Sequence, residues 1–397
     1  MIKKPVRAIV AAIDAAAARW SDPSFDPRVR ARAAAAARTG YSLAAVDHAF
    51  DALFGSIRRS ELEAIIASEL GSLDVLDCFV ESDARPAARA LPIGRVAIVA
   101  SRTTVGVAIV PAIFALCAKC HVLVKDREDH LVAAFFDTLS GELPELRAAA
   151  RAQSWRGEDD AVSLREFDAV VAFGSDATLT TIGAHVGYPA RFIGFGSKAS
   201  AGYVTRETLA DESDARELAA GAARDLVLYE TEGCLSLHCL FVERGGAVSI
   251  ERFAGYLQSA LRDACRRFSD GPRGARRRAE ARDLATFRGQ TAVADAGVNY
   301  LTIVDAPLDE PPLFLPRAIR IHAIDDCAQA AHYFRRHGIS LEALALSQAR
   351  RDLLELAVAA GAARVAPFGT LQRPPLGAFH GGRPRIAEFV RWIGWEA

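Results

Sequence analysis

Between residues 95 and 195, short apolar runs alternate with segments of helical periodicity, and this alternation constrains the fold more than any other feature. The runs are RVAIVA, HVLVK, FDAVVAFG and RFIGFG, and helical patterns such as VGVAIVPAIFALCAK separate them. Runs that are apolar at nearly every residue are typical of parallel strands covered by helices on both faces. Their alternation with helices is typical of βαβ units, so the sequence predicts an α/β fold with a mostly parallel sheet.

The flanking regions extend this pattern. Residues 1 to about 90 are rich in Ala, Arg and Leu with helical spacing. A helical pattern, DARELAAGAARDLVL, leads into a second α/β region, which continues through SLHCLFVE, IERFAGYLQSALRDACRRF, VNYLTIVD and AIRIHAI. The charged segment GPRGARRRAEARD is interpreted as an exposed connection.

Length and composition exclude several classes of protein. With 397 residues, 51% of them hydrophobic, the chain can form two packed domains, and a net charge of −1 gives no general attraction to nucleic acid. Seven cysteines without regular spacing argue against a disulfide framework and for a reducing compartment. Asp14 interrupts the apolar N-terminal run, which favours an amphipathic helix over a signal peptide. No apolar stretch is long enough to span a bilayer, so we expect a cytoplasmic protein without a membrane span.

The stretch YETEGCLSLH, residues 229–238, raises a question of chemistry. Cys234 follows Gly233 in a turn, and a glycine lets a reacting group approach the backbone closely. Cys234 is therefore either an exposed nucleophile or a small core residue, and on its residues alone both interpretations stay open. The segment CAKCH matches a haem-attachment pattern, and Cys234, His238 and Cys239 are zinc-type ligands. Haem attachment normally needs an exported protein. No second pair of ligands follows at the spacing of a zinc finger or zinc ribbon, so we predict no metal site.

Five segments in one order resemble a known family. EGCLSLH resembles the nucleophile loop of the aldehyde dehydrogenase superfamily, and in particular that of its acyl-CoA reductases, the branch that contains the fatty-acid reductase of bacterial luminescence. The other segments, spread over residues 92–396, are VGVAIVPAIFALCAKCHVLVKDRED, VAFGSDATLTTIG, FGSKASAGYV and RVAPFGTLQRPPLGAFHGGRPRIAEFVRWIGWE. The resemblance implies an aldehyde-dehydrogenase-like fold with a Rossmann-type cofactor domain and an α/β catalytic domain. We place the helical N-terminal region and dinucleotide-binding domain at 1–228 and the catalytic domain at 229–365. The segment 366–397 is expected to pack back on the cofactor domain or on a subunit interface.

The resemblance also implies a reaction. The Cys234 thiolate would attack the thioester carbonyl of an acyl-CoA and expel CoA, and hydride from NADPH or NADH would then reduce the acyl-cysteine to an aldehyde. Because the attacking and leaving thiols have similar pKa values, the exchange is close to balanced. The implied partners are an acyl-CoA or acyl-carrier donor, further copies of the chain in a homo-oligomer, and an acyl-transfer protein.

Three departures from the family pattern bear on activity. Where the aldehyde-oxidising enzymes carry the glutamate of ELGGK, this chain reads GFGSK with Gly194, and the loss of that base favours reduction over hydrolysis. Thr103 stands where the family supplies an asparagine to the oxyanion hole, so its hydroxyl becomes the candidate donor beside the Cys234 N–H. Pro312 stands where the family carries the glutamate of EIFGP, with Glu310 two residues away. These departures leave open a catalytically degenerate scaffold, and a cysteine acyltransferase or thioesterase is a third hypothesis.

The cofactor residues are also assigned by resemblance. Lys125 matches a lysine that contacts the adenosine ribose, with a solvated strand-end lysine as the alternative. Gly174 and Ser175 match the turn that faces the pyrophosphate, with Ser175 as a simple helix N-cap as the alternative. Arg127 favours NADP and Glu128 favours NAD, and NADPH is slightly preferred.

Two histidines and a basic segment also bear on the site. His238 is interpreted as a buried histidine with satisfied hydrogen bonds, and His380 recurs in the family signature without an assigned role. The arginines between 262 and 288 are interpreted as a solvated helix face, with a site for CoA phosphates or an acidic carrier protein as the alternative.

Overall fold

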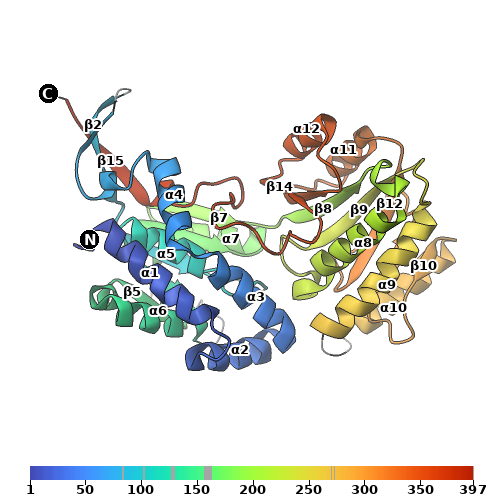
Figure 1. The fold of residues 1–397 in the computed structure, drawn as a ribbon, viewed down its shortest axis with the longest axis horizontal. Helices are drawn as coiled ribbons and strands as arrows, with labels where there is room; N and C mark the ends of the chain where they lie inside the picture. The colour runs from blue at the N-terminus through green and yellow to red at the C-terminus, as the bar shows by residue number, and fades with distance from the viewer. Residues whose placement is uncertain are drawn as a thin grey trace.

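Two large, mostly parallel sheets follow one another along the long axis of the molecule (Figure 1). The structure is a computed structural model and describes residues 1–82, 85–101, 103–126, 130–155, 163–269, 271 and 273–396.

The first sheet has five strands in the order β5-β4-β3-β6-β7, and every neighbouring pair is parallel. Its strands are β3 (Arg95–Val99), β4 (His121–Lys125), β5 (Ala150–Gln153), β6 (Ala169–Phe173) and β7 (Arg191–Phe195). The connecting helices are α5 (Ile109–Cys117), α6 (Leu131–Glu142) and α7 (Asp176–Ala184). The predicted parallel α/β unit is confirmed. The strand order reverses between β3 and β6, and in open α/β sheets ligands bind at the carboxyl ends of strands beside such a reversal.

Four N-terminal helices pack on this unit. They are α1 (Val6–Ser21), α2 (Asp26–Thr39), α3 (Leu43–Ser56) and α4 (Arg59–Leu70). Their apolar faces meet at Trp20, which is fully buried and lies 5.0 Å from Phe54 and 6.1 Å from Phe135 of α6, between ring centroids. The Ser42 hydroxyl caps α3 by accepting from the Ala45 N–H. This cluster fixes α3 beside the end of the first sheet.

A small antiparallel sheet joins the two ends of the chain. It consists of β1 (Val80–Ser82), β2 (Arg85–Pro92) and β15 (Val390–Trp395), with Val390 opposite Pro92. Figure 1 shows the C-terminal segment returning from β14 to β15, beside β2. The expectation that residues up to about 90 are helical is wrong for the last ten, because their partner strand lies almost 300 residues away and leaves no local pattern.

The second large sheet has seven strands in the order β10-β11-β12-β9-β8-β13-β14, parallel except between β10 and β11. Its strands are β8 (Ala199–Val204), β9 (Leu237–Glu243), β10 (Thr291–Val293), β11 (Leu301–Val304), β12 (Ala318–Ile324), β13 (Leu341–Leu346) and β14 (Arg364–Pro367). Its helices are α8 (Glu212–Val227), α9 (Ile250–Phe268), α10 (Ala275–Phe287), α11 (Cys327–Arg336) and α12 (Arg351–Ala359). In Figure 1, α8, α9 and α10 lie on one side of this sheet and α11 and α12 on the other.

Two details differ from the sequence analysis. The division between the two large sheets falls between β7 and β8, whereas the predicted domain boundary lies at 228/229. The segment predicted to be an exposed connection lies largely in the helix α10, and only Arg278 and Ala285 of that helix are buried. Arg278 donates to the carbonyls of Val298, Arg273 and Pro316, and its Nη2 has no hydrogen-bond partner among the described residues.

In the part of the chain that the structure describes, no helix combines the length and apolarity needed to cross a membrane.

Candidate active site

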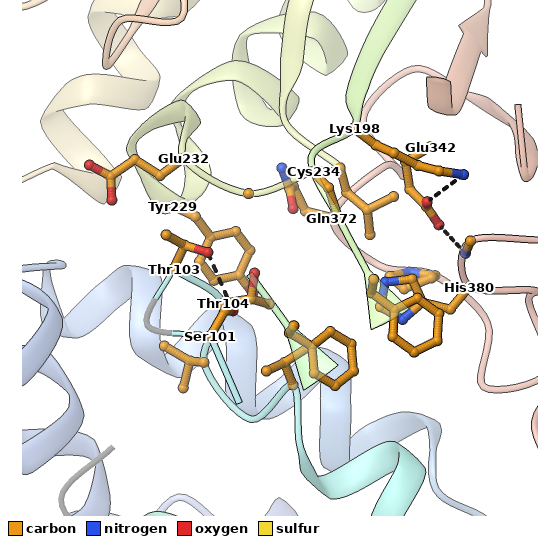
Figure 2. A pocket seen from close by; sticks show the side chains of 18 of the residues that line it. Ser101, Thr103, Thr104, Lys198, Tyr229, Glu232, Cys234, Glu342, Gln372 and His380 are labelled. Carbon is orange, nitrogen blue, oxygen red and sulfur yellow. Dashed lines mark hydrogen bonds and ion pairs between the residues drawn. The ribbon is translucent and has the colours of Figure 1, made fainter. Parts of the chain in front are cut away.

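A cavity of about 810 Å³ opens between the two large sheets. Its wall includes α3, the loops after β3, β6 and β7, the turn that carries Cys234, the start of β13 and the C-terminal segment. Figure 2 shows Cys234 facing Thr103 and Thr104 across this space, with Glu342 and His380 further along it. The cavity therefore brings together residues from both ends of the chain at the carboxyl edge of the first sheet.

The loop that carries Cys234, residues 229–236, has an unusual backbone, and we call it the nucleophile loop. After α8, three successive non-glycine residues, Tyr229, Glu230 and Thr231, have φ values of 56°, 54° and 61°. Each left-handed non-glycine residue costs on the order of 1–3 kcal/mol, and such strain persists only where the surroundings determine the conformation. The strand β9 follows the loop, so no helix N-terminus stands directly behind Cys234.

A buried ion pair and several hydrogen bonds hold the nucleophile loop. The Glu230 carboxylate lies 2.8 Å from the Arg317 guanidinium, and the two side chains are 4% and 1% exposed. The Ser269 hydroxyl donates to Glu230 over 2.9 Å. The Thr231 hydroxyl donates to the Leu226 carbonyl and accepts from the Arg317 backbone N–H, each over 2.8 Å. Arg317 thus contacts two of the three left-handed residues and fixes the approach to Cys234.

The Cys234 thiol is partly exposed to the cavity. Burial raises its pKa to about 12, the Glu342 carboxylate acts in the same direction, and Lys198 acts against them. The Ser200 hydroxyl donates to the Cys234 carbonyl over 2.7 Å and anchors the loop to β8. The resting cysteine is therefore a thiol, and a reaction at this sulfur needs an acceptor for its proton.

Thr103 lines the cavity, as expected of a candidate oxyanion donor. Its hydroxyl lies 3.4 Å from the Ser101 hydroxyl, and its carbonyl accepts from the Tyr41 hydroxyl over 2.8 Å. Thr104 also lines the cavity, and its hydroxyl oxygen lies 3.7 Å from the position of a Cβ built on Gly233. Sequence reasoning missed Thr104, and the role of Thr103 stays a prediction.

The candidate cofactor residues separate into two places. Gly174 and Ser175 lie at the carboxyl end of β6 and line the cavity, and the Ser175 hydroxyl caps α7 by accepting from the Thr178 N–H. Lys125 ends β4, is 7% exposed, and places its ammonium 4.9 Å from the centre of the Trp155 ring. Lys125 is not among the described residues that line the cavity. Arg127 and Glu128, which bear on the choice of cofactor, lie outside the described residues.

Both histidines that the sequence analysis weighed line the cavity. His238 is 5% exposed, its Nδ1 accepts from the Ser200 N–H over 3.3 Å, and burial lowers its pKa to about 4, so the prediction of a buried, satisfied histidine is confirmed. His380 stacks on Phe195 with 4.4 Å between ring centroids and lies 5.5 Å from Phe173. Burial lowers the pKa of His380 to about 3, so both rings are neutral.

The family is decided by sequence comparison. Residues 1–392 match the family described as acyl-CoA reductase (LuxC). The chain belongs to this family. The resemblance drawn from five segments is confirmed, and the match extends it over the N-terminal helices. A search of curated proteins finds no significant match.

Solved structures agree on the fold. The chain is similar to an NAD-dependent benzaldehyde dehydrogenase from Corynebacterium glutamicum, with 15% identity, a TM-score of 0.68, and coverage of 100% of this chain and 87% of the other. It is similar to aldehyde dehydrogenase 21 from Physcomitrella patens in complex with succinate, with 11% identity and a TM-score of 0.73. The match covers 99% of this chain and 86% of the other. It is also similar to the aldehyde dehydrogenase KauB from Pseudomonas aeruginosa, with 13% identity and a TM-score of 0.73. The match covers 100% of this chain and 85% of the other. The predicted aldehyde-dehydrogenase-like fold is confirmed.

Within this acyl-CoA reductase family member, the departures at 194 and 312 can now be placed. A Cβ added at Gly194 would lie 3.2 Å from Leu179 and from Phe192, so a glutamate there would have to displace one of them. Glu310 forms ion pairs with Arg320 (2.8 Å) and Arg288 (3.0 Å) and is not among the described residues of the cavity wall. A cofactor contact from Glu310 therefore has no support in this geometry.

The site also contains polar residues that sequence reasoning missed. Glu342 is buried in the cavity wall, and its signal was a lone carboxylate in the apolar run LEALAL. Gln372 donates to the Ser236 hydroxyl over 3.1 Å and so ties the C-terminal segment to the nucleophile loop. Among the described residues, no group of three or more His, Cys, Asp or Glu side chains is placed to hold a metal ion.

Proposed function

We propose that this chain reduces an acyl-CoA thioester to an aldehyde through an acyl-cysteine on Cys234. The observation that carries the proposal is that one cavity is lined by Cys234, the turn at Gly174 and Ser175, and the threonines opposite the thiol. A thioester placed between the thiol and Thr103 would meet a nucleophile on one side and a hydroxyl donor on the other. Membership of the acyl-CoA reductase family supports the substrate class.

In the first half-reaction the Cys234 sulfur bonds to the carbonyl carbon, and the bond from that carbon to the CoA sulfur breaks. The Thr103 hydroxyl and the Cys234 N–H are the proposed donors to the transient oxyanion. In the second half-reaction the acyl group accepts a hydride, the bond to Cys234 breaks, and aldehyde leaves. NADPH or NADH supplies that hydride when bound.

The fit of a dinucleotide is supported by the turn after β6. A Cβ on Gly174 would lie 3.1 Å from the Thr178 side chain, so glycine leaves the backbone open at this point, and α7 begins directly behind it. A helix N-terminus favours a phosphate group. The benzaldehyde dehydrogenase relative is NAD-dependent, and an indole-3-acetaldehyde dehydrogenase with a TM-score of 0.70 was solved with NAD+. These relatives support a nicotinamide cofactor, and our preference for NADPH over NADH is a proposal. Lys125 stays a proposed cofactor contact through the neighbouring strand end.

We also propose a homo-oligomer, a cytoplasmic location and an acyl-CoA or acyl-carrier donor, with an acyl-transfer protein as a further partner. The exposed aromatic residues of β15 support the oligomer, because Trp392 and Trp395 are 40% and 59% exposed on a strand at the edge of the small sheet.

The test is acyl-CoA-dependent oxidation of NADPH and of NADH, followed by absorbance over a series of acyl chain lengths, with aldehyde identified as the product. Wild type should turn over, Cys234→Ala should not, and Cys78→Ala, which removes an exposed thiol elsewhere, should match wild type. Cofactor binding without turnover would favour the degenerate scaffold. Release of free acid without cofactor oxidation would favour a thioesterase.

A further inference from the structure

Glu342 is a buried carboxylate in the wall of the cavity. It is the second residue of β13, in the run LEALAL, and its side chain is 4% exposed. An ionised carboxylate in an apolar strand is costly unless it is paired and hydrogen-bonded. Glu342 has both kinds of partner, since Lys198 lies 3.5 Å away and the Gly381 N–H donates to it over 2.9 Å. Lys198, Gly381 and Glu342 all line the cavity.

The charge of Glu342 reaches the Cys234 sulfur. After burial, the Glu342 carboxylate is the largest cause of the raised pKa of the Cys234 thiol, while Lys198 lowers it. Figure 2 shows the paired Lys198 and Glu342 on the same side of the cavity as Cys234, with Gln372 beside the cysteine. Because Glu342 and Cys234 line the same cavity from the same side, the carboxylate is placed to take the proton of that thiol.

Three other titratable side chains of this wall, His238, His380 and Glu232, have neighbours of their own. Backbone groups of Thr231, Ser236 and Ser200 hydrogen-bond the His238 ring, and the His380 ring stacks on Phe195. Glu232 is paired with Arg273 over 2.7 Å. Because burial raises the pKa of the Cys234 thiol, an attack by this sulfur needs a group that accepts its proton.

We propose that Glu342 is the general base for acylation of Cys234, an inference that deepens the proposed function and rests on it. As the sulfur of Cys234 bonds to the thioester carbon, its proton passes to a Glu342 carboxylate oxygen. As the bond from carbon to the CoA sulfur breaks, Glu342 returns the proton and CoA leaves as a thiol. The net change is one thioester exchanged for another, with no proton gained or lost. Lys198 is a positioning residue, because its ion pair holds the carboxylate in place.

The carboxylate reaches this position through sheet pairing. β13 pairs with β8, whose first residue, Ala199, lies opposite Leu341, and Lys198 directly precedes β8. At position 194, where a family glutamate would stand, this chain has a glycine crowded by the side chains of Leu179 and Phe192. A carboxylate of this cavity wall comes instead from Glu342 on the strand β13.

The experiment compares two reactions of the same sulfur in the full-length protein. The first is acylation by an acyl-CoA without NAD(P)H, quenched at successive times and read by intact mass. The second is alkylation by iodoacetamide, which reacts with the thiolate and leaves the cavity open, so that water can take the proton. The variants are Glu342→Gln and a matched control, Glu243→Gln. Glu243 is another buried, ion-paired glutamate of the same sheet, and it is not among the described cavity residues.

We expect Glu342→Gln to slow acylation by about 10²-fold or more, the usual range for loss of a general base. The same variant should speed alkylation at a fixed pH, because the charge that disfavours the thiolate is gone. Glu243→Gln should leave both rates near those of wild type. Glu342→Asp keeps the charge but withdraws it by one methylene, and it should slow acylation by about tenfold with little change in alkylation.

Four outcomes would overturn the proposal. Acylation of Glu342→Gln at the wild-type rate would place the base elsewhere. A parallel fall in the acylation and alkylation rates of Glu342→Gln would assign Glu342 a structural role only. If Glu342→Gln does not fold, an undiminished acylation rate in Glu342→Asp would show that Glu342 is not the base. Wild type that alkylates at Cys234 but never acylates would remove the proposed function itself, and this inference with it.

Discussion

The buried pair of Glu230 and Arg317 should control both the stability of the protein and the reactivity of Cys234. Arg317→Met leaves the Glu230 carboxylate buried without its counter-charge. It also removes the guanidinium hydrogen bonds to the carbonyls of Arg273 (2.9 Å) and Gly271 (3.3 Å). Breaking a buried pair by removing one partner costs about 3–5 kcal/mol, and the hydrogen bonds belong to the same network, so they are not added to that figure. We therefore expect the free energy of unfolding to fall by about 3–5 kcal/mol.

The effect on Cys234 follows from the left-handed backbone at 229–231. The Arg317 guanidinium binds Glu230 and so helps to hold this unfavourable conformation, while the bond to Thr231 comes from the Arg317 backbone N–H and remains in Arg317→Met. Without the guanidinium we expect the loop to relax and the acylation rate of Cys234 to fall together with stability.

The assay is equilibrium urea unfolding followed by tryptophan fluorescence, with acylation by an acyl-CoA measured in the folded baseline. Arg244→Met is the control, because Arg244 also contacts two carboxylates, at 3.4 Å each, but is 46% exposed. Exposed pairs contribute about 0–1 kcal/mol, so the control should lose no more than that. The double variant Glu230→Gln, Arg317→Met should be more stable than Arg317→Met alone, because no uncompensated carboxylate remains. An Arg317→Met protein no less stable than the control, or a destabilised protein with unchanged acylation, would refute the reasoning.

Three further predictions concern other parts of the site. Thr103→Ala should lower the acylation rate by about 10²-fold while Thr104→Ala has a small effect, and the opposite ranking would assign the oxyanion donor to Thr104. Burial raises the pKa of Asp225 from 3.8 to about 7, so the folded protein holds this proton more tightly than the unfolded chain. As the pH rises from about 4 to about 7, the free energy of unfolding of wild type relative to Asp225→Asn should therefore fall by about 1.4 kcal/mol per pH unit. A difference between the two proteins in urea unfolding that does not change with pH would contradict this. Ser175→Ala should cost about 1 kcal/mol through loss of the α7 cap and also weaken NADPH binding in a titration by fluorescence, whereas unchanged binding would leave Ser175 with the cap alone.

The parts of the fold that were predicted from sequence are those whose signal is local. Strands such as β3 and β6 are continuously apolar, and α9 has a strong helical period over its nineteen residues, so neighbours along the chain already specify them. The pairing of β2 with β15 depends on contacts between the two ends of the chain, and no local pattern encodes it. The arginines of α10 predicted a helix face in solvent, whereas Arg278 is buried and donates to the carbonyls of Val298, Arg273 and Pro316, contacts that no local pattern encodes.

For the candidate site, too, the residues predicted from the sequence are those whose signal is local. Cys234, Gly174 and Ser175 lie in turns with recognisable neighbours, and all three line the cavity. Glu342 reaches the cavity only because β13 pairs with β8, which sequence spacing does not reveal. The strain at 229–231 was equally hidden, because it depends on Arg317, far along the chain.

The central claim is that Cys234 carries the acyl group. The most direct measurement is the intact mass of the protein after incubation with acyl-CoA thioesters of several lengths, without reductant. We predict one added acyl group on wild type and on Cys239→Ala, none on Cys234→Ala, and loss of the adduct as aldehyde once NADPH or NADH is added. Folded wild-type protein that acquires no acyl group from any thioester, or an adduct that persists in Cys234→Ala, would contradict the account.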